Sequence, residues 1–257
     1  MGLLDDKVTI VTGAGRGIGA AAARLFAREG ALLVLAARSG DEVEALAAEL
    51  RADGARAVAV AADLTTEAGA ERPVEAALDA FGRLDGAFDN AGNGPVPAPL
   101  AERSPDEWDE VHALNLRGTW LCLRAQLRAL RSAGRGGSVV LNSGVGALVG
   151  GFGDGAQQAA KHGLTGLVRA ATAECAGHGV RVNAVAPGVV RTPATEPYFA
   201  AGPEFAALVA RSTPLGRPAR AAEVAEAAAW LLSDRSSYVT GVTLPVDGGI
   251  TATRRFD

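Results

Sequence analysis

The sequence predicts an α/β fold in which a single parallel sheet is covered by helices on both faces. Short apolar runs rich in β-branched residues alternate along the chain with longer amphipathic, alanine-rich stretches, which is the pattern of repeated strand–helix units. Of the 257 residues, 48% are hydrophobic, enough to bury one sizeable core, and no repeat or low-complexity linker divides them. We therefore expect residues 1–257 to form one domain.

The expected elements follow one another from strand to helix. Gly30 is the stop signal of the first helix, and Ser104, Pro105 and Glu107 give the fourth helix an N-cap, a first-turn proline and a capping-box acid. The expected strands are 8–11, 31–37, 57–61, 84–88, 138–141, 180–185 and 242–246. The expected helices are 16–28, 41–52, 67–80, 105–131, 155–176 and 221–232.

Residues 191–220 are the one long stretch without a regular pattern. Five prolines stand there among apolar residues, so we expect irregular structure. Loops of this length in compact domains are usually functional lids or flexible segments. We interpret this segment as a lid over a substrate site.

Composition and charge exclude several classes of protein. The 25 basic and 29 acidic residues leave a net charge of −4 and a pI near 5.5, so a nucleic-acid partner is not expected. Apolar runs such as 31–37 stop far short of the ~20 residues that span a membrane, and the first residues carry acids where a signal peptide needs bases, so we expect a cytoplasmic protein. Cys122 and Cys175 lie far apart without metal-ligand spacing, which predicts neither a disulfide nor a metal site.

A glycine-rich turn follows the first expected strand and opens the first expected helix. Residues 12–19 read TGAGRGIG, so Gly13, Gly17 and Gly19 meet the spacing TGxxxGxG, whereas GxGxxG is not met. Free backbone N–H groups and the positive end of the helix converge at such a turn, and glycine lets a ligand approach the backbone. We expect a pyrophosphate to bind here; an ordinary strand-to-helix connection is the alternative.

Further motifs follow in order along the chain. They are Asp63-Leu64 after the third strand, Asn90-Ala91-Gly92 after the fourth, Asn115 and Lys161 in helices four and five, PGVVRT at 187–192, and YVTG and PVDGG near the end. Together with the glycine turn, these motifs resemble the short-chain dehydrogenase/reductase family over about residues 7–250. Their joint occurrence in this order is far more specific than any one of them.

The resemblance implies a single-domain, Rossmann-type, doubly wound parallel sheet of seven strands, with NAD(P) lying where the strand order reverses. It implies that Asp63 meets the adenine, that Asn90 lines the adenosine ribose region, and that Val190 and Thr192 hold the nicotinamide carboxamide. A turn acid at Asp63 and a simple chain reversal at 187–188 are the alternatives. The implied cofactor-binding residues are Gly13, Arg16, Gly17, Ile18, Gly19, Arg38, Asp63, Leu64, Asn90, Ala91, Gly92, Lys161, Pro187, Gly188, Val190 and Thr192.

The second strand ends in a way that favours NADP(H) over NAD(H). An NAD-preferring enzyme usually places an acid there, which binds the ribose hydroxyls and repels a 2′-phosphate. Here the position is Ala37, and Arg38 follows it, while Arg16 lies in the glycine turn. Two guanidinium groups are able to clamp a phosphate with charge-assisted hydrogen bonds. Solvated surface arginines are the alternative interpretation.

The catalytic positions depart from the family pattern. The resemblance implies a Tyr-x-x-x-Lys pair on the fifth helix: the tyrosine exchanges a proton with the substrate oxygen, and the lysine binds the ribose. Counting back four residues from Lys161 gives Gln157, whose amide has no proton to give or take near neutral pH. The family's serine would stand at Gly144, with Ser143 one position early.

A one-residue slip along a strand ordinarily turns a side chain to the other face, so Ser143 either lines the pocket through an altered turn or is tied to backbone. The resemblance implies that Asn115 holds a water linking the lysine to solvent, with a buried helix-to-strand hydrogen bond as the alternative. The candidate catalytic residues are Asn115, Ser143, Gln157 and Lys161.

Two side chains are candidates to replace the missing phenol as proton donor. Asp154 lies three residues before Gln157, and Tyr198 lies in the lid. A helix-start acid and a lid aromatic are their alternative interpretations. His162 points about a quarter-turn away from Lys161, so we expect it on a packing or subunit face.

Two functions are compatible with these observations. The first is an NADP(H)-dependent oxidoreductase that acts on a carbonyl or alcohol of a largely apolar small molecule, with a remodelled proton-transfer site. The second is an NAD(P)-binding homologue without net redox turnover, either a non-redox biosynthetic catalyst or an inactive or regulatory subunit. The expected pocket residues are Val145, Leu148, Phe152, Tyr198 and Phe199.

The resemblance also implies a homotetramer that assembles through the fourth and fifth helices and the C-terminal segment. Small residues along 156–173 allow close helix approach.

Overall fold

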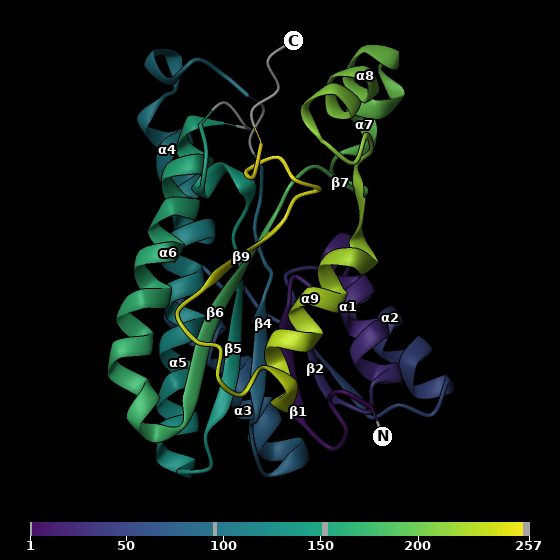
Figure 1. Ribbon diagram of the computed structural model, residues 1–257. Coiled ribbons are helices and arrows are strands. Elements are labelled where there is room, and N and C mark those ends of the chain that lie inside the picture. Colours follow the sequence, from purple (N-terminus) through teal and green to yellow (C-terminus); the bar gives the residue numbers. More distant parts are fainter. Residues whose placement is uncertain (1, 95–96, 151–153, 254–257) are drawn as a thin grey trace.

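A computed structural model describes residues 2–94, 97–150 and 154–253 (Figure 1). Its centre is a seven-stranded sheet in the order β3-β2-β1-β4-β5-β6-β9, in which every neighbouring pair is parallel. The strand order reverses between β1 and β4, because the chain builds outward from β1 in one direction and then from β4 in the other. The strands are β1 (Val8–Thr12), β2 (Leu32–Ala37), β3 (Ala57–Ala61), β4 (Gly86–Asp89), β5 (Gly137–Asn142), β6 (Val180–Pro187) and β9 (Thr243–Val246).

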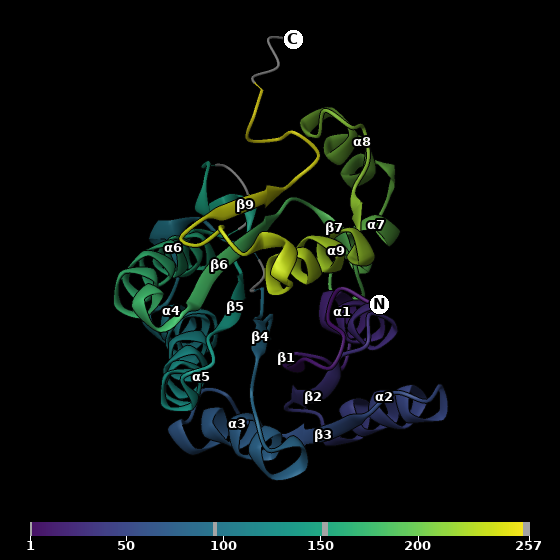
Figure 2. The same cartoon turned by 60° about the horizontal axis from the view of Figure 1, so that its bottom comes forward.

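Helices cover both faces of the sheet, as Figures 1 and 2 show. On one face α1 (Gly17–Arg28), α2 (Gly40–Ala52) and α9 (Ala221–Leu232) enclose one apolar core. On the other face α3 (Glu67–Phe81), α5 (Thr119–Ala133) and α6 (Gly155–Cys175) enclose a second core. Besides η2, α7 and α8, which are described below, the described residues form α4 (Pro105–His112) and the short 3₁₀ turns η1 (Leu100–Glu102), η3 (Val145–Ala147), η4 (Ala176–His178) and η5 (Asp234–Ser236).

The predicted doubly wound parallel sheet is confirmed. All seven expected strands are present, and their ends differ from the expected ranges by no more than two residues. The capping box at Ser104 and Glu107 is also present, with Pro105 in the first turn of α4. Cys122 and Cys175 are buried free thiols.

Two expectations about the chain were wrong. The single helix expected over 105–131 is interrupted by a π-helical segment, η2 (Ala113–Gly118), whose wider turn separates α4 from α5. The lid over 191–220 is not irregular either, since it contains α7 (Glu196–Ala200), α8 (Pro203–Ser212) and a parallel pair, β7 (Val190–Arg191) and β8 (Ala219–Arg220). Its prolines misled the interpretation because two of them occupy first helical turns, where a missing N–H costs nothing.

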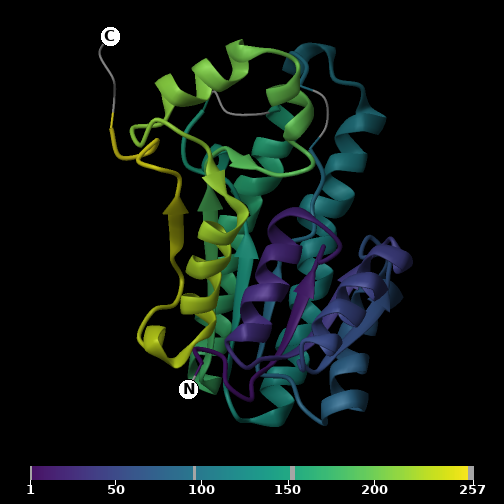
Figure 3. The same ribbon diagram turned by 90° about the vertical axis from the view of Figure 1, so that its right-hand side faces the viewer.

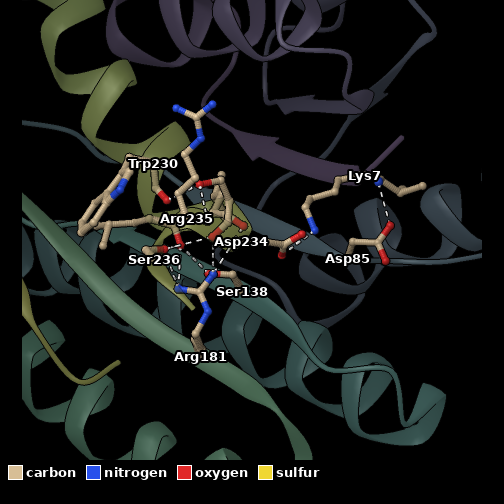
Figure 4. Close-up of polar contacts among 12 residues, drawn as sticks. Lys7, Asp85, Ser138, Arg181, Trp230, Asp234, Arg235 and Ser236 are labelled. Carbon is tan, nitrogen blue, oxygen red and sulfur yellow. Dashed lines mark hydrogen bonds and ion pairs between the residues drawn. The ribbon is translucent and has the colours of Figure 1, made fainter. Parts of the chain in front are cut away.

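The lid helices α7 and α8 lie beyond the carboxyl ends of the strands, which point toward them in Figure 3. Active sites of open α/β sheets lie at these ends of the strands. The opposite end of the sheet is tied to α9 by Arg181 of β6, which donates to the backbone carbonyls of Leu231 and Ser233 and to the hydroxyl of Ser236 (Figure 4). These bonds satisfy carbonyls that a helix end leaves without partners.

Within the described residues, no helix is long and apolar enough to cross a membrane. The same part of the chain holds no group of three His, Cys, Asp or Glu side chains that could bind a metal ion.

Candidate functional site

The glycine turn connects β1 to α1 and depends on the absence of side chains. Gly13 and Gly17 have φ values of 63° and 60°, in the left-handed region that favours glycine. A Cβ on Gly19 would lie 2.1 Å from the carbonyl oxygen of Gly13, so only glycine fits there. Arg16, the N-cap of α1, makes no capping hydrogen bond with its side chain. The turn therefore presents the N-terminus of α1 to an anionic ligand.

Asn90 holds this turn in place. Its backbone N–H and that of Ala91 donate to Thr12 Oγ1, at 3.0 and 3.1 Å. Its side-chain Nδ2 donates to the carbonyls of Thr12 and Gly13, and its Oδ1 accepts from Asn142 Nδ2 at 2.8 Å. The carboxyl ends of β1, β4 and β5 are thus fastened together beside the point where the strand order reverses.

The residues expected to meet the adenosine end lie at the tips of β2 and β3. Arg16 and Arg38 are both exposed, so their guanidinium groups are available to a ligand phosphate. Asp63 Oδ1 accepts from the hydroxyl of Thr65 at 2.8 Å and from its N–H. These hydrogen bonds lower the pKa of the Asp63 carboxyl, with a smaller contribution from the charge of Arg38. Asp63 therefore shapes its own turn, whatever it also contacts.

The expected catalytic positions meet in a cluster of amides around Lys161. Asn115 Nδ2, from the π-helical segment, donates to the Asn93 carbonyl at 3.1 Å and to Asn93 Oδ1 at 2.5 Å. Gln157 Nε2 donates to the same carbonyl at 3.1 Å. Lys161 Nζ donates to the carbonyl of Asn142 at 2.6 Å. Gln157 and Lys161 are one helical turn apart on α6, as the four-residue spacing predicts.

Burial changes the chemistry of the lysine. The pKa of the Lys161 ammonium falls to about 8 because the charged form is removed from water. A Cβ on Gly92 would lie 2.8 Å from Asn115 Oδ1 and 3.6 Å from Lys161 Nζ, so both atoms pack close to this glycine and a side chain does not fit there. Asn115 Oδ1 and Asn142 Oδ1 are buried acceptors without a hydrogen-bond partner among the described residues.

These features fit a nicotinamide dinucleotide. The positive-φ glycine turn suits a pyrophosphate, and the unpartnered amide oxygens and the Lys161 ammonium suit the hydroxyls of a ribose. Gly13, Gly17, Gly19 and Lys161 are the residues that would hold it.

Ser143 takes the alternative role. Its hydroxyl is buried and donates to the backbone carbonyl of Lys161 at 3.2 Å, so it ties β5 to α6. At Gly144, where the resemblance implies a serine, a Cβ would meet none of the described residues within 4 Å.

Neither expected substitute for the phenol is placed as a free proton donor. Asp154 forms a buried ion pair with Arg103 and caps α6 by accepting from Ala156 N–H. Burial alone would raise the pKa of this carboxyl, but the hydrogen bonds from Arg103 and from backbone N–H groups outweigh it and hold the pKa below its usual value. Tyr198 is 42% exposed and packs on Phe205.

The remaining candidates are His162 on α6 and the residues expected to line a substrate pocket. His162 is exposed in the single chain, and its Nδ1 pairs with the carbonyl of Gln158; the expected subunit face at this position stays a prediction. An open pocket of about 720 Å³ lies at the base of the lid, and Val145, Leu148, Tyr198 and Phe199 do not line it; Phe152 lies outside the described residues. The residues that line it are Arg191, Thr192, Pro193, Glu196, Pro197 and Ala200.

Asn93, Asn142 and Arg103 contribute to the site but were not expected from the sequence. Asn93 and Asn142 directly adjoin expected site residues, which is the only signal the sequence carries for them. Their contribution is largely through backbone carbonyls, which side-chain patterns do not reveal.

A doubly wound sheet with a glycine turn at its switch point defines a nucleotide-binding protein of the Rossmann type. A family model described as "Enoyl-(Acyl carrier protein) reductase" matches residues 13–251. The chain is 45% identical, over 97% of each chain, to an A-factor type gamma-butyrolactone 1'-reductase (1S-forming) of Streptomyces virginiae. It is 42% identical to a cis-4-hydroxycyclohexanecarboxylate dehydrogenase of Sinomonas cyclohexanicum, over 96% of this chain and 97% of the relative.

Solved structures agree. Levodione reductase superposes with a TM-score of 0.91 at 37% identity, covering 98% of this chain and all of the other. Carveol dehydrogenase from Mycobacterium avium, in complex with NAD, superposes with a TM-score of 0.93 at 32% identity, with the same coverage. The chain belongs to the short-chain dehydrogenase/reductase family. This membership and the NAD-bound neighbour support a nicotinamide cofactor.

Proposed function

We propose that the protein is an NADP(H)-dependent oxidoreductase that interconverts an alcohol and a ketone on a cyclic, largely apolar small molecule. The observation that carries the proposal is the half-buried Lys161 at the carboxyl ends of β4 and β5, in a fold whose glycine turn is intact. The names of the relatives support the substrate class, since they refer to a butyrolactone, a cyclohexanecarboxylate and levodione.

The choice of NADP(H) rests on charge at the adenosine end. Arg16 and Arg38 are exposed there, and Ala37 stands where an NAD-preferring enzyme has an acid. A 2′-phosphate would gain two charge-assisted contacts from these guanidinium groups. When bound, the nicotinamide supplies or accepts the hydride of the reaction.

The proton-transfer site is remodelled in this proposal. Gln157 occupies the tyrosine position and Gly144 the serine position, so this chain's own residues bind and orient the substrate oxygen without a phenol. The Gln157 amide holds the Asn93 loop against α6, which keeps the wall of the site in place.

The test is turnover of NADPH with a panel of cyclic ketones, followed by the absorbance of the dihydronicotinamide and by chromatography of the alcohol. We expect reduction of at least one cyclic ketone, with NADPH preferred over NADH. Absence of nicotinamide oxidation with every member of the panel would exclude the proposal.

A second candidate function is favoured by the same substitution. An amide at position 157, already bonded to a backbone carbonyl, is what a dinucleotide-binding homologue without redox turnover would tolerate. A Gln157→Tyr variant that stays inert as a reductase, while the unaltered protein transforms a substrate without consuming cofactor, would favour this second candidate.

A further inference from the structure

The groups that surround the reacting position offer one proton donor. The contacts of the described residues there come from the amides of Asn93, Asn115 and Gln157, and amides do not exchange protons usefully near neutral pH. The two tyrosines lie elsewhere, since Tyr198 packs on α8 and Tyr238 is fully exposed. Lys161 is the titratable side chain that remains.

Lys161 is set up to release a proton. Among the described residues it forms no ion pair, and its Nζ donates to a neutral carbonyl, that of Asn142. A desolvated ammonium without a carboxylate partner holds its proton less tightly than an exposed ammonium does. Burial accordingly lowers the pKa of Lys161 to about 8. A proton donor and acceptor works best when its pKa lies near the working pH.

Charged groups on the elements packed around Lys161 are engaged elsewhere. Asp154 pairs with Arg103, Asp89 accepts from Gln126, and Arg117 donates to the carbonyl of Thr65. Two histidines lie on these elements, His162 on α6 and His112 on α4. Each pairs through its ring Nδ1 with a backbone carbonyl of its own helix. These contacts leave the Lys161 ammonium without a counter-charge.

Gly92 borders the ammonium. A Cβ on it would stand 3.6 Å from Nζ and 2.8 Å from Asn115 Oδ1, so only a residue without a side chain fits at this position. Nζ therefore lies at the wall of the site that Gly92 lines, where that residue places no side chain over the ammonium.

The rarity of lysine in this chain supports the same role for Lys161. Only two of its 25 basic residues are lysines, Lys7 and Lys161, and the others are arginines. Arginine keeps its proton in proteins, whereas a buried lysine gives it up readily. The cation retained at the site is the type that can do acid–base chemistry.

We propose that Lys161 itself exchanges the proton with the substrate oxygen, in place of the missing tyrosine. This inference rests on the proposed function. In the reducing direction the ketone carbon receives the hydride and its oxygen takes a proton from Nζ, which breaks one N–H bond and forms one O–H bond. The neutral amine then regains a proton from water. In the oxidising direction the neutral amine accepts the alcohol proton.

The first test measures titration without turnover. The protein is pulse-labelled with acetic anhydride across a range of pH, and acylation of each lysine is read by peptide mass spectrometry. We expect the labelling of Lys161 to rise with a midpoint near pH 8. A midpoint near 10.4, the ordinary value for lysine, would overturn the inference.

Lys7 provides the matched control. It pairs with Asp234 at the opposite end of the sheet (Figure 4), and a Lys7→Arg variant leaves Lys161 as the only ε-amine. The Lys161 midpoint and the turnover rate are expected to be the same in this variant as in the unaltered protein.

The second test separates charge from proton transfer. Lys161→Arg keeps a cation but not a releasable proton, so NADPH binding followed by fluorescence should change only a few-fold while the rate falls about 10²-fold or more. A rate within a few-fold of the unaltered protein would overturn the inference but leave the proposed function standing. If the unaltered protein itself neither bound NADPH nor turned over a ketone, the proposed function would be contradicted instead.

Should Lys161→Arg fail to fold or to bind NADPH, Lys161→Cys treated with bromoethylamine restores an amine of lower basicity at the same place. With Lys161 as the proton donor, the pH at which ketone reduction declines should shift downward with the new amine. An unchanged pH profile would overturn the inference.

Discussion

In the proposed function, Arg38 is the exposed side chain expected to set the cofactor preference. Its guanidinium lies at the end of β2, where it already influences the carboxyl of Asp63. Replacing Arg38 by Asp reverses the local charge, so a 2′-phosphate is repelled rather than bound. We expect Arg38→Asp to weaken NADPH binding at least about 10-fold, which corresponds to about 1.4 kcal/mol of binding free energy. Binding of NADH should be unchanged.

Fluorescence titration of both cofactors measures this change. Arg128→Asp, at an exposed position on α5, is the control for a general charge effect and should leave both affinities unchanged. Equal losses for NADH and NADPH in Arg38→Asp would mean that the arginine does not read the phosphate.

Asp89 carries a pH dependence that belongs to stability rather than to turnover. Its carboxyl is buried at the end of β4 and accepts from Gln126 Nε2 at 2.8 Å, its one hydrogen-bond donor among the described residues. Burial raises the pKa of this carboxyl to about 7. Between about pH 4 and pH 7 the folded protein therefore holds a proton that the unfolded chain has lost. The free energy of unfolding must fall as the pH rises through this range.

Asp89→Asn removes this titration. The new amide can also donate to Gln126 Oε1, which is buried without a partner. Relative to the unaltered protein, the variant should gain stability as the pH rises from 4 to 8, by up to about 4 kcal/mol, since each pKa unit is worth about 1.4 kcal/mol. Urea unfolding across this range measures it, with exposed Asp41→Asn as control; a constant difference between the two proteins would contradict the argument.

At this scale the sequence predicted which residues would gather but not how they bond. The spacing of Gln157 and Lys161 on one helix brought them together as expected. The sequence also shows glutamine, and not tyrosine, four residues before Lys161, although only the family resemblance gives that position a meaning. The shared acceptor of Asn115 and Gln157 was not visible, because it is the backbone carbonyl of Asn93 and depends on the path of a loop.

Among the elements, the N-terminus of α6 is fastened by an ion pair that the sequence did not predict. Asp154 and Arg103 are 51 positions apart, and their side chains are only 2% and 4% exposed. Removing one member of a buried pair costs up to about 3–5 kcal/mol. Arg103 keeps a longer ion pair, at 3.5 Å, with the exposed Glu107, which limits this loss. Asp154→Asn keeps a good N-cap but loses the charge, so we expect a loss of stability of this order.

Urea unfolding tests this expectation, and the pH profile of turnover tests whether Asp154 is also the proton donor. Glu44→Gln, which breaks an exposed pair with Arg51, should cost less than about 1 kcal/mol. A pH profile that loses its midpoint in Asp154→Asn, with stability unchanged, would restore Asp154 as a candidate acid.

Elements that local patterns specify were predicted well, and those that tertiary contacts specify were not. The buried strands and amphipathic helices are encoded in runs of neighbouring residues. The π-helical segment is different. It adds about one residue to a single helical turn, and this does not change the spacing of apolar residues enough to be recognised in the sequence. It lets Asn115 turn its Nδ2 toward Asn93 and Val111. The lid helices were missed because Pro197 and Pro203 looked like breakers although they start helices.

For the whole molecule, the order of the strands brings the glycine turn, the end of β4 and the start of α6 together at the carboxyl end of the sheet. Alternation of strands and helices predicted the parallel sheet, but its order followed only from the family resemblance. That order matters because β1 pairs with both β2 and β4, which opens the crevice at the reversal.

The outer face of α6 carries the prediction about assembly. We propose a homotetramer in which this face packs against its counterpart, as the family resemblance implies. Gly166 and Ala170 are exposed on it, and a Cβ on Gly166 would meet nothing within 4 Å in the single chain. Gly166→Arg therefore fits the isolated chain, where it also improves helix propensity, but places a bulky charge where two helices would meet.

We expect the unaltered protein to elute with four times the 26.0 kDa chain mass in size-exclusion chromatography with light scattering, and Gly166→Arg to elute as a smaller species with unchanged circular dichroism. Ala45→Arg, at an exposed position of α2 on the other face of the sheet, is the matched control and should keep the full assembly. A monomeric unaltered protein would exclude the tetramer. A Gly166→Arg protein that still forms the tetramer would move the interface away from α6, because a dry contact between small residues cannot accommodate a buried guanidinium without a partner.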